Sequence, residues 1–583
     1  MTQGNPSGPG PTHGRASSPT KPSSSGCPAP FSSRGMRAAR RSASPRATRS
    51  TPRRRTTVST ASGSGRSPPS TACAWRSRVC GDASARTSVP RFTAPRLPRC
   101  AGAVALALAL LLGAGIRPLP ALASGLQVPA VGTLGSGPLA EDAASLHWNP
   151  AQLAALDQPQ LLVGGHLIAG DLRYRRERRA AYQREDAFHF RLPIPADAID
   201  PSRTGSEPTV RANPLGLAPS IFLAMPLGTA RPATAAIGVY APYAALVSLP
   251  DDGPQRFAVQ EATIAAVHTT VSLGVEPVAG LRLGGGASLV LGYADIRRVQ
   301  DFAALSELGD ALAGPAINQP NDFGPDAPPA VRELEALARP IHLRDATGAG
   351  VTFQLGASAD LGADWQLGAS WQHGVPLTLR GRFVLDMDDP FFTGDLAAQG
   401  LEYAPRIEGR AQLGIRLPGS LHAGVRWRGH PAWTVDAWGT LTRWSTLEAF
   451  DVRVRSAGLA QPELGVGDAS SLRIERQWRD TVGAESVVHH SPRDTWTIRG
   501  RGGLRTGASP DETVDMSSPD GTRIIAGAGI EQPLTSALSL HGDLLVHHVL
   551  RRTVAASRHD LANGTYRFTL LSAGLFLTLT PRG

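Results

Sequence analysis

The sequence feature that most constrains the fold is a strict alternation of apolar and polar residues from residue 160 to the C-terminus. In the segment 351–359, every second residue is apolar: Val351, Phe353, Leu355, Ala357 and Ala359. The same period recurs over residues 365–371, 421–427, 433–437 and 571–579. A period of two is that of a β-strand, whose successive side chains point to opposite faces. The alternation therefore predicts an all-β fold.

Two architectures are built from such strands. In a soluble sheet the apolar face packs on a core, and in an outer-membrane barrel it meets lipid. Short turns such as 361–364 alternate with longer polar connections, which favours the barrel. An interfacial girdle of tryptophans is expected at the strand ends, formed by Trp365, Trp371, Trp427, Trp433 and Trp444. We expect a transmembrane antiparallel β-barrel and keep a secreted soluble β-protein as the alternative.

A sheet embedded in lipid must close on itself, because unpaired backbone N–H and C=O groups in hydrocarbon are costly. The mature residues 124–583 can supply about 14 strands of roughly 10 residues each, with their connections. A polytopic helical membrane protein would need several apolar runs of roughly 20 residues, and the mean hydropathy of −0.13 argues against them.

The net charge of +11 suggests a nucleic-acid partner only when the whole chain is averaged. Residues 1–123 hold 19 of the 59 basic residues and 1 of the 48 acidic ones. Subtraction leaves 40 basic and 47 acidic residues in 124–583, a net charge of −7. A surface of that sign does not attract a polyanion, so we expect no nucleic-acid partner.

The N-terminal part of the chain has the composition of an export leader. Residues 1–96 are rich in Ser, Pro and Arg, and we expect a disordered extension that arises from a wrongly assigned start. Residues 97–123 combine an arginine, an apolar run and Ala121-Leu122-Ala123, which predicts a signal peptide cleaved after Ala123. All four cysteines precede that site, so the mature chain has no disulfide and no thiolate metal site.

The residues after the predicted cleavage site resemble the N-terminal plug of the OmpP1/FadL/TodX family, the FadL-type outer-membrane transporters of long-chain fatty acids and hydrocarbons. An acidic and Ala/Ser-rich stretch at 141–145 leads to Asn149-Pro150-Ala151. The family usually has glycine next, whereas this chain has Gln152. Further segments resemble family strands in the family's order, at 237–243, 365–385, 417–421, 433–445 and 509–523. The resemblance covers nearly all of 124–583.

This resemblance implies a 14-stranded barrel at 160–583, with a hatch at 124–159 inside its lumen, in the bacterial outer membrane. The implied function is passive uptake of long-chain fatty acids, which an outer loop captures and a wall opening releases sideways into membrane lipid. An aromatic or alkane hydrocarbon channel, and a structural or adhesive barrel without transport, stay open as alternatives. We expect a monomer with no cofactor and no enzymatic activity, inserted by the barrel-assembly machinery. The chain ends on Leu579-Thr580-Pro581-Arg582-Gly583, which lacks the terminal aromatic residue that this machinery usually recognises.

Three groups of residues are candidates for the transport site. The resemblance assigns Asn149, Pro150 and Ala151 to the hatch, as a conformational trigger; the alternative is an ordinary Asn-Pro turn. Two apolar helical stripes in the outer loop 301–341 are candidates for a capture groove: Phe302, Leu305, Leu308 and Leu312, then Val331, Leu334 and Leu337. Packing of these stripes on each other and on the barrel is equally compatible with the pattern.

Three arginines are candidates for holding a fatty-acid carboxylate. Arg282, Arg380 and Arg426 lie on the polar phase of their strands, which predicts that they face the lumen. Arginine suits a carboxylate because its guanidinium can donate two parallel hydrogen bonds. The alternative for each is a pairing with acidic residues of the lumen. No motif in the mature chain indicates a metal site or a catalytic triad.

Overall fold

The computed structural model describes residues 126–178, 205–206, 208–301, 338–395, 397–400, 402–462, 467–492, 495–557 and 560–581. All of them belong to one unit of the chain, residues 96–583. The extension expected at 1–96 and the signal peptide expected at 97–123 lie outside the described residues. The seven apolar candidates of the outer loop, all within 302–337, also lie outside them.

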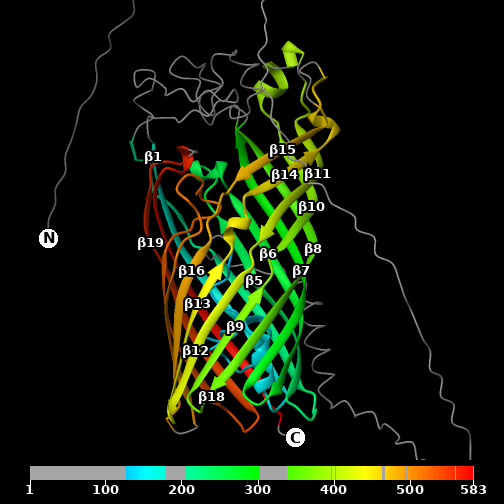
Figure 1. The fold of residues 1–583 in the computed structure, drawn as a ribbon. Coiled ribbons are helices and arrows are strands. Elements are labelled where there is room, and N and C mark those ends of the chain that lie inside the picture. Colours follow the sequence, from blue (N-terminus) through cyan, green and yellow to red (C-terminus); the bar gives the residue numbers. More distant parts are fainter. Residues whose placement is uncertain are drawn as a thin grey trace, which may run out of the picture. The chain divides into compact units, whose positions relative to one another are not determined.

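The described strands form one antiparallel sheet that closes into a barrel (Figure 1). The strands are β1 Gln160–Arg178, β2 Gly205–Ser206, β3 Val210–Ala212, β4 Leu215–Pro226, β5 Ala233–Ser248, β6 Glu261–Val278, β7 Leu281–Asp301, β8 Ala338–Leu361, β9 Trp365–Gln372, β10 Val375–Asp386, β11 Arg406–Leu417, β12 Ser420–His430, β13 Trp433–Thr442, β14 Ala449–Arg455, β15 Ala469–Glu475, β16 Thr481–His490, β17 Thr497–Arg505, β18 Arg523–Pro533, β19 Leu538–Val554 and β20 Gly564–Leu579.

The first and last strands close the barrel, because β1 pairs with β4 on one side and with β20 on the other. The β1–β20 ladder runs from Leu161↔Leu579 to Arg176↔Gly564. Several wall positions consist of consecutive segments, namely β2–β4, β9–β10, β11–β12, β13–β14 and β15–β16, so the wall has 14 strand positions. The predicted all-β, 14-stranded barrel is confirmed.

Short turns and long connections separate to opposite ends of the barrel. We call the end of the barrel that carries the short turns the lower end. These turns are 227–232, 279–280, 362–364, 431–432, 491–496 and 534–537. The connections at the upper end are longer and include 249–260, 387–405 and 506–522. Outer-membrane barrels place short turns in the periplasm and long loops outside the cell, so the upper end faces the exterior.

The helices of the described residues are short. They are α2 Ser145–Trp148 and the single turns η1 Pro150–Ala155, η4 Pro254–Phe257, η7 Phe391–Asp395, η8 Ala397–Gln399, η9 Trp444–Thr446, η10 Ala457–Leu459 and η12 Asp560–Ala562. None of the helices within the described ranges has the length and apolar character needed to cross a membrane.

The outer side of the lower barrel is apolar. On β9 the exposed residues are Trp365, Leu367, Ala369 and Trp371, whereas the residues between them are buried. Trp433 is also exposed, as an interfacial girdle requires. The girdle prediction is wrong for Trp444, which is only 1% exposed. Its ring lies inside the barrel against Trp478 and Tyr243, with ring centroids 4.9 and 6.2 Å apart.

The apolar side of the wall changes from the outer face to the inner face where β9 continues into β10. Below the break the apolar residues point outward, and above it they point inward: Val375, Leu377, Leu379, Phe383 and Leu385 are buried. The residues of β10 that face outward include Thr378 and Arg380. The same exchange separates β12 from β11 across Pro418 and Gly419. The lower barrel therefore suits lipid outside, and the upper barrel suits water outside and an apolar interior.

A pair of arginine substitutions tests this boundary. Leu367→Arg places a charge on the lipid-facing side of β9 and should destabilise the barrel by about 2–4 kcal/mol, as at a bilayer midplane. Thr378→Arg, on the exposed side of β10, should have little effect, because that side is already charged. Heat-modifiable migration and urea unfolding in lipid vesicles measure both. Equal destabilisation by the two variants would contradict the proposed membrane boundary.

Candidate functional site

An inner segment, residues 126–159, lies within the lower barrel and contains no strand (Figure 1). Its helical turns α2 and η1 contact β5, β6, β7 and β8. Leu146 and Leu153 also share an apolar cluster with Phe222, Tyr240 and Phe576 of the neighbouring strands β4, β5 and β20. From the distant part of the wall, Arg501 of β17 donates hydrogen bonds to Leu134 O and Ser136 O of the inner segment, both at 3.4 Å.

Aligned glycines let the inner segment approach the wall closely. Gly274, Gly284 and Gly356 lie opposite one another on β6, β7 and β8. A Cβ atom at Gly274 would lie 2.6 Å from the carbonyl oxygen of Pro150, and one at Gly284 or Gly356 would overlap Pro150 or Asn149. Only glycine leaves room for the backbone of the inner segment at these positions.

The predicted hatch residues lie at this contact. Asn149 is fully buried, and its side-chain oxygen accepts a hydrogen bond from Ala151 N at 3.2 Å. Its Nδ2 donates to Pro138 O at 3.0 Å and to Ala357 O of β8 at 3.3 Å. Pro150 begins η1, where its missing N–H costs nothing. Asn149 thus joins the inner segment to the wall; its role as a trigger remains a prediction.

A network of arginines and carboxylates fixes the same segment from below. The Oε1 atom of Glu141 lies 3.9 Å from Arg282 Nη1, 3.6 Å from Arg426 Nη1 and 3.8 Å from Arg428 Nη1. Gln366 Nε2 donates to the same oxygen at 3.3 Å. One carboxylate of the inner segment therefore attracts three arginines of the wall. The neighbouring Asp142 carboxyl has its pKa raised by desolvation, against the hydrogen bond from Ser136, which lowers it.

Two of the three predicted carboxylate-binding arginines face the lumen, as expected, and both have partners there. Arg282 pairs with Asp360 at 2.9 Å and with Glu276 at 3.1 Å. Arg426 donates two hydrogen bonds to Asp436, at 2.6 and 2.8 Å. These contacts are the lumen pairings that were the alternative to a ligand site.

The predicted lumen position of Arg380 is wrong. Apolar residues keep odd numbers from Val351 through Leu385, so the sequence shows one continuous phase. The chain breaks at His373 and Gly374, and β10 presents its odd-numbered residues to the interior instead of to the outside. Arg380 therefore lies exposed on the outer side of the upper barrel.

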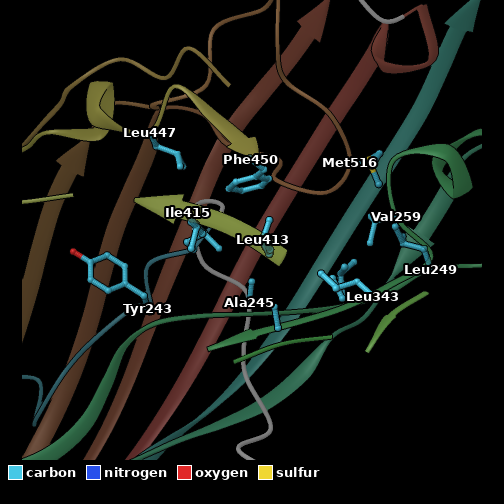
Figure 2. Packing of buried hydrophobic residues seen from close by; sticks show 14 of the residues in the cluster. Tyr243, Ala245, Leu249, Val259, Leu343, Leu413, Ile415, Leu447, Phe450 and Met516 are labelled. Atoms are coloured by element: carbon cyan, nitrogen blue, oxygen red, sulfur yellow. The ribbon is translucent and has the colours of Figure 1, made fainter. Parts of the chain in front are cut away.

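The upper lumen holds a large apolar cluster (Figure 2). Figure 2 shows residues from the wall strands β5, β8, β11 and β14 converging with residues from the upper connections. The labelled members are Tyr243, Ala245, Leu249, Val259, Leu343, Leu413, Ile415, Leu447, Phe450 and Met516. We call this set, with the other buried members around it, the upper apolar cluster. It offers hydrocarbon a low-dielectric environment within the lumen.

A group of buried arginines borders the upper apolar cluster. Arg505 ends β17 and Arg523 begins β18, and the two lie directly opposite each other on these neighbouring strands. Val549, a cluster member, is the partner of Arg523 on β19. The connection 506–522 between the two arginines contributes Ala508, Val514 and Met516 to the cluster. Charge and hydrocarbon are therefore adjacent at this place.

The charges in this group are unbalanced. Glu485 accepts hydrogen bonds at 2.6 Å from both Arg501 Nη2 and Arg505 Nη2. Arg523 is 2% exposed, and no hydrogen bond or ion pair reaches its guanidinium from the described residues. The carboxylate of Asp520, which accepts from the amides of Ala508 and Ser509, acts on Arg523 only through space.

The sequence patterns did not single out Arg505 or Arg523. Each stands at a strand end next to a long connection, and such a position usually predicts a solvated residue. The connection 506–522 folds inward and covers them, which only the tertiary structure shows. Within the described part of the chain, no group of three or more His, Cys, Asp and Glu side chains is arranged to hold a metal ion.

The wall is incomplete beside β5. Pairing of β4 with β5 ends at Ile221↔Val239, although both strands continue upward. The β5–β6 register shifts between Tyr240 and Tyr243. The inner segment pairs with the freed edge of β5: Val128 N donates to Pro242 O at 3.1 Å, and Ala244 N donates to Leu126 O at 2.8 Å. The start of the inner segment therefore covers the place where the wall opens.

Replacing Asn149 by Ala removes three hydrogen bonds, two of them buried, and takes the side-chain partner from Pro138 O and Ala151 N. We expect the attachment of the inner segment to weaken by about 1–3 kcal/mol, and substrate uptake to fall, while the barrel still assembles. Hydrogen exchange of residues 126–159 and heat-modifiable migration measure the two effects. Asn213→Ala is the control, because Asn213 makes one 3.3 Å bond outside the lumen network. Normal uptake in Asn149→Ala would argue against the trigger.

Comparison with known proteins agrees with this architecture. The family model described as outer membrane protein transport protein (OMPP1/FadL/TodX) matches residues 121–581. A FadL homologue from Pseudomonas aeruginosa has 16% identity and a TM-score of 0.61, and the alignment covers 78% of this chain and 99% of that one. Among curated proteins, none matched significantly.

Two toluene transporters share the fold as well. TbuX of Ralstonia pickettii has 12% identity and a TM-score of 0.52, with 80% of this chain and 99% of that one covered. TodX of Pseudomonas putida has 14% identity and a TM-score of 0.54, and the alignment covers 78% of this chain and 99% of that one. At these identities the likeness concerns the fold, whereas the family match spans most of the chain. The chain belongs to the OMPP1/FadL/TodX family, outer-membrane transport proteins for hydrophobic compounds rather than enzymes, as its sequence resemblance predicted.

Proposed function

We propose that this chain takes up long-chain fatty acids, which pass through the upper apolar cluster and leave sideways into the outer membrane. The observation that carries the proposal is the buried guanidinium of Arg523, which has no ion-pair partner among the described residues and lies beside apolar side chains. A ligand that satisfies both features has a long hydrocarbon chain and one carboxylate.

The hydrocarbon part of such a ligand supplies the driving force. Each CH₂ group moved from water to an apolar environment contributes about 0.8 kcal/mol. The upper apolar cluster offers that environment inside the lumen, and the lipid around the lower barrel offers it again at the exit. Transport is downhill from water to membrane and needs no nucleotide.

The carboxylate part would be held where Arg505 and Arg523 face each other. Glu485 neutralises one positive charge but is shared between Arg501 and Arg505. A ligand carboxylate would give Arg523 the hydrogen-bonded partner that a buried charge requires. Arg282 and Arg426, which already bind acidic residues of the lumen, are better suited to fixing the inner segment.

Release would occur beside β5, where the wall is incomplete. Movement of Leu126–Val128 away from the edge of β5 would connect the lumen with the membrane, because β4 and β5 do not pair above Val239. The inner segment would act as the hatch, with Asn149 holding it to β8. Capture from outside would fall to the apolar residues of the loop 302–337, as the family resemblance implies.

An aromatic or alkane hydrocarbon is the alternative substrate. The toluene transporters with the same fold keep it open, and a neutral ligand would gain nothing from Arg523. The two substrates therefore differ in one testable respect, which is the dependence of binding on a negative charge.

Binding of oleate and of its methyl ester, which has the same chain without the charge, separates the two. We expect wild-type protein to bind oleate more tightly, and Arg523→Gln to lose about 1.5–3 kcal/mol for oleate but little for the ester. Arg380→Gln, on the outer surface, is the control. Equal affinity of the wild type for oleate and methyl oleate would exclude a carboxylate site, and tight toluene binding unaffected by Arg523→Gln would favour the hydrocarbon reading.

A reversible cross-link tests the exit. Gln127 and Tyr243 are bridge partners, and opposed residues of antiparallel chains lie about 4.5–5.5 Å apart at Cα, within reach of a disulfide. The four native cysteines all lie within residues 27–100, before the predicted cleavage site. The double variant Gln127→Cys with Tyr243→Cys should therefore form one disulfide, which fixes the inner segment to β5. Uptake should stop under oxidation and return on reduction, whereas each single variant should respond to neither. Full uptake by the cross-linked protein would rule out this exit.

A further inference from the structure

A row of arginines crosses the outer side of the upper barrel. Arg173 on β1 lies opposite Arg211 on β3 and opposite Arg567 on β20. Arg551 lies in the β19 bulge beside Arg567, where the register shifts between Val549 and Arg552. Alternate residues of these strands, such as Leu172 and Phe568, are buried, so the arginines point outward. Four adjacent strands thus place their cations side by side.

These side chains form a recess on the outer wall. Five arginines and two threonines line a cleft of about 260 Å³, and the arginines are Arg173, Arg175, Arg211, Arg551 and Arg567. A cleft of this size accommodates a phosphate group and part of the sugar that carries it. Its lining is mostly hydrogen-bond donors of one charge.

Among the described residues, four of the five arginines of the cleft form no ion pair with an acid. The exception is Arg173, whose Nε and Nη2 donate to the carboxylate of Asp171 at 3.0 and 2.9 Å. Glu177 continues the outward phase of β1 beyond Arg175 but forms no ion pair with it. Like charges directly opposite in a sheet are destabilising, so the row opposes folding unless an anion lies among the guanidinium groups.

The row stands just above the lipid-facing belt. On β20 the exposed leucines are Leu571, Leu575 and Leu577, and Arg567 lies four residues above the highest of them. At about 3.4 Å per residue this is roughly 14 Å along the strand. Leu215 and Leu217 of β4 continue the apolar belt below Arg211. A lipid with its acyl chains against these leucines would bring its headgroup to the arginines.

We propose that this cleft binds the phosphorylated glycolipid of the outer leaflet, with the lipid A phosphates held by Arg173, Arg211, Arg551 and Arg567. Each guanidinium can donate two parallel hydrogen bonds to phosphate, which a row of ammonium groups could not do. The apolar belt below selects a membrane lipid over a soluble phosphate. The site lies on the outer side of the wall and is separate from the transport path in the lumen.

Binding of defined lipid A species to the full chain in detergent tests the proposal. The test variant is Arg211→Gln with Arg551→Gln and Arg567→Gln, and the matched control is Arg380→Gln with Arg416→Gln, two exposed arginines of β10 and β11 outside the row. We expect bisphosphorylated lipid A to bind the wild type and the control at least about tenfold more tightly than the test variant. Native mass spectrometry measures the bound lipid, with inorganic phosphate as competitor.

The unfolding temperature separates loss of binding from loss of fold. Without glycolipid, the test variant should melt at or above the wild-type temperature, because the like-charge row is gone. Bisphosphorylated lipid A should raise the melting temperature of the wild type but not that of the variant. Wild-type affinity in the variant, equal binding of dephosphorylated lipid A, or displacement by inorganic phosphate at a matched phosphate concentration would each overturn the assignment.

Discussion

The constraint on which the rest of the structure depends is the backbone hydrogen bond in hydrocarbon. A lipid-facing sheet has no water to satisfy its N–H and C=O groups, so every wall strand must pair on both sides. Here the β1–β20 ladder, from Leu161↔Leu579 to Arg176↔Gly564, removes the last edge of the sheet. Closure creates a lumen, and with it a space in which polar and apolar chemistry can be arranged independently of the surrounding membrane.

That lumen is divided by height. Its lower part holds the inner segment through glycines that admit its backbone and through Glu141 among three arginines. Its upper part is apolar, because the strands above the breaks at His373–Gly374 and Pro418–Gly419 direct their hydrocarbon side chains inward. The same breaks move charged side chains to the outside. One change in strand geometry thus produces both an apolar interior and a solvated exterior above the membrane.

The edge that the wall leaves free beside β5 is covered from within. Above Val239 the strand β5 has no partner in β4, and Leu126–Val128 supplies hydrogen bonds to it instead. A covering segment that is not one of the wall strands can leave without opening the barrel elsewhere. Buried arginines lie next to its first residues, since Gln127 accepts a hydrogen bond from Arg505 at 2.9 Å. In the proposed mechanism, occupation of the site at Arg505 and Arg523 and movement of Leu126–Val128 would involve neighbouring residues.

Periodicity and the Asn149-Pro150-Ala151 motif by themselves determined the all-β class, the barrel with its outer apolar belt, and the family, because these depend on local alternation and short-range pattern. Such reasoning could not determine which side of a strand faces the lumen. Arg380 is even-numbered, like the polar residues of β9 that face inward, but it faces outward because the chain breaks at His373 and Gly374. Trp444 has the character of a girdle residue and is buried by its contact with Trp478. Arg523 became a candidate site only because the connection 506–522 folds over it. Contacts between segments distant in sequence decide the burial of such residues, so only the tertiary structure could identify them.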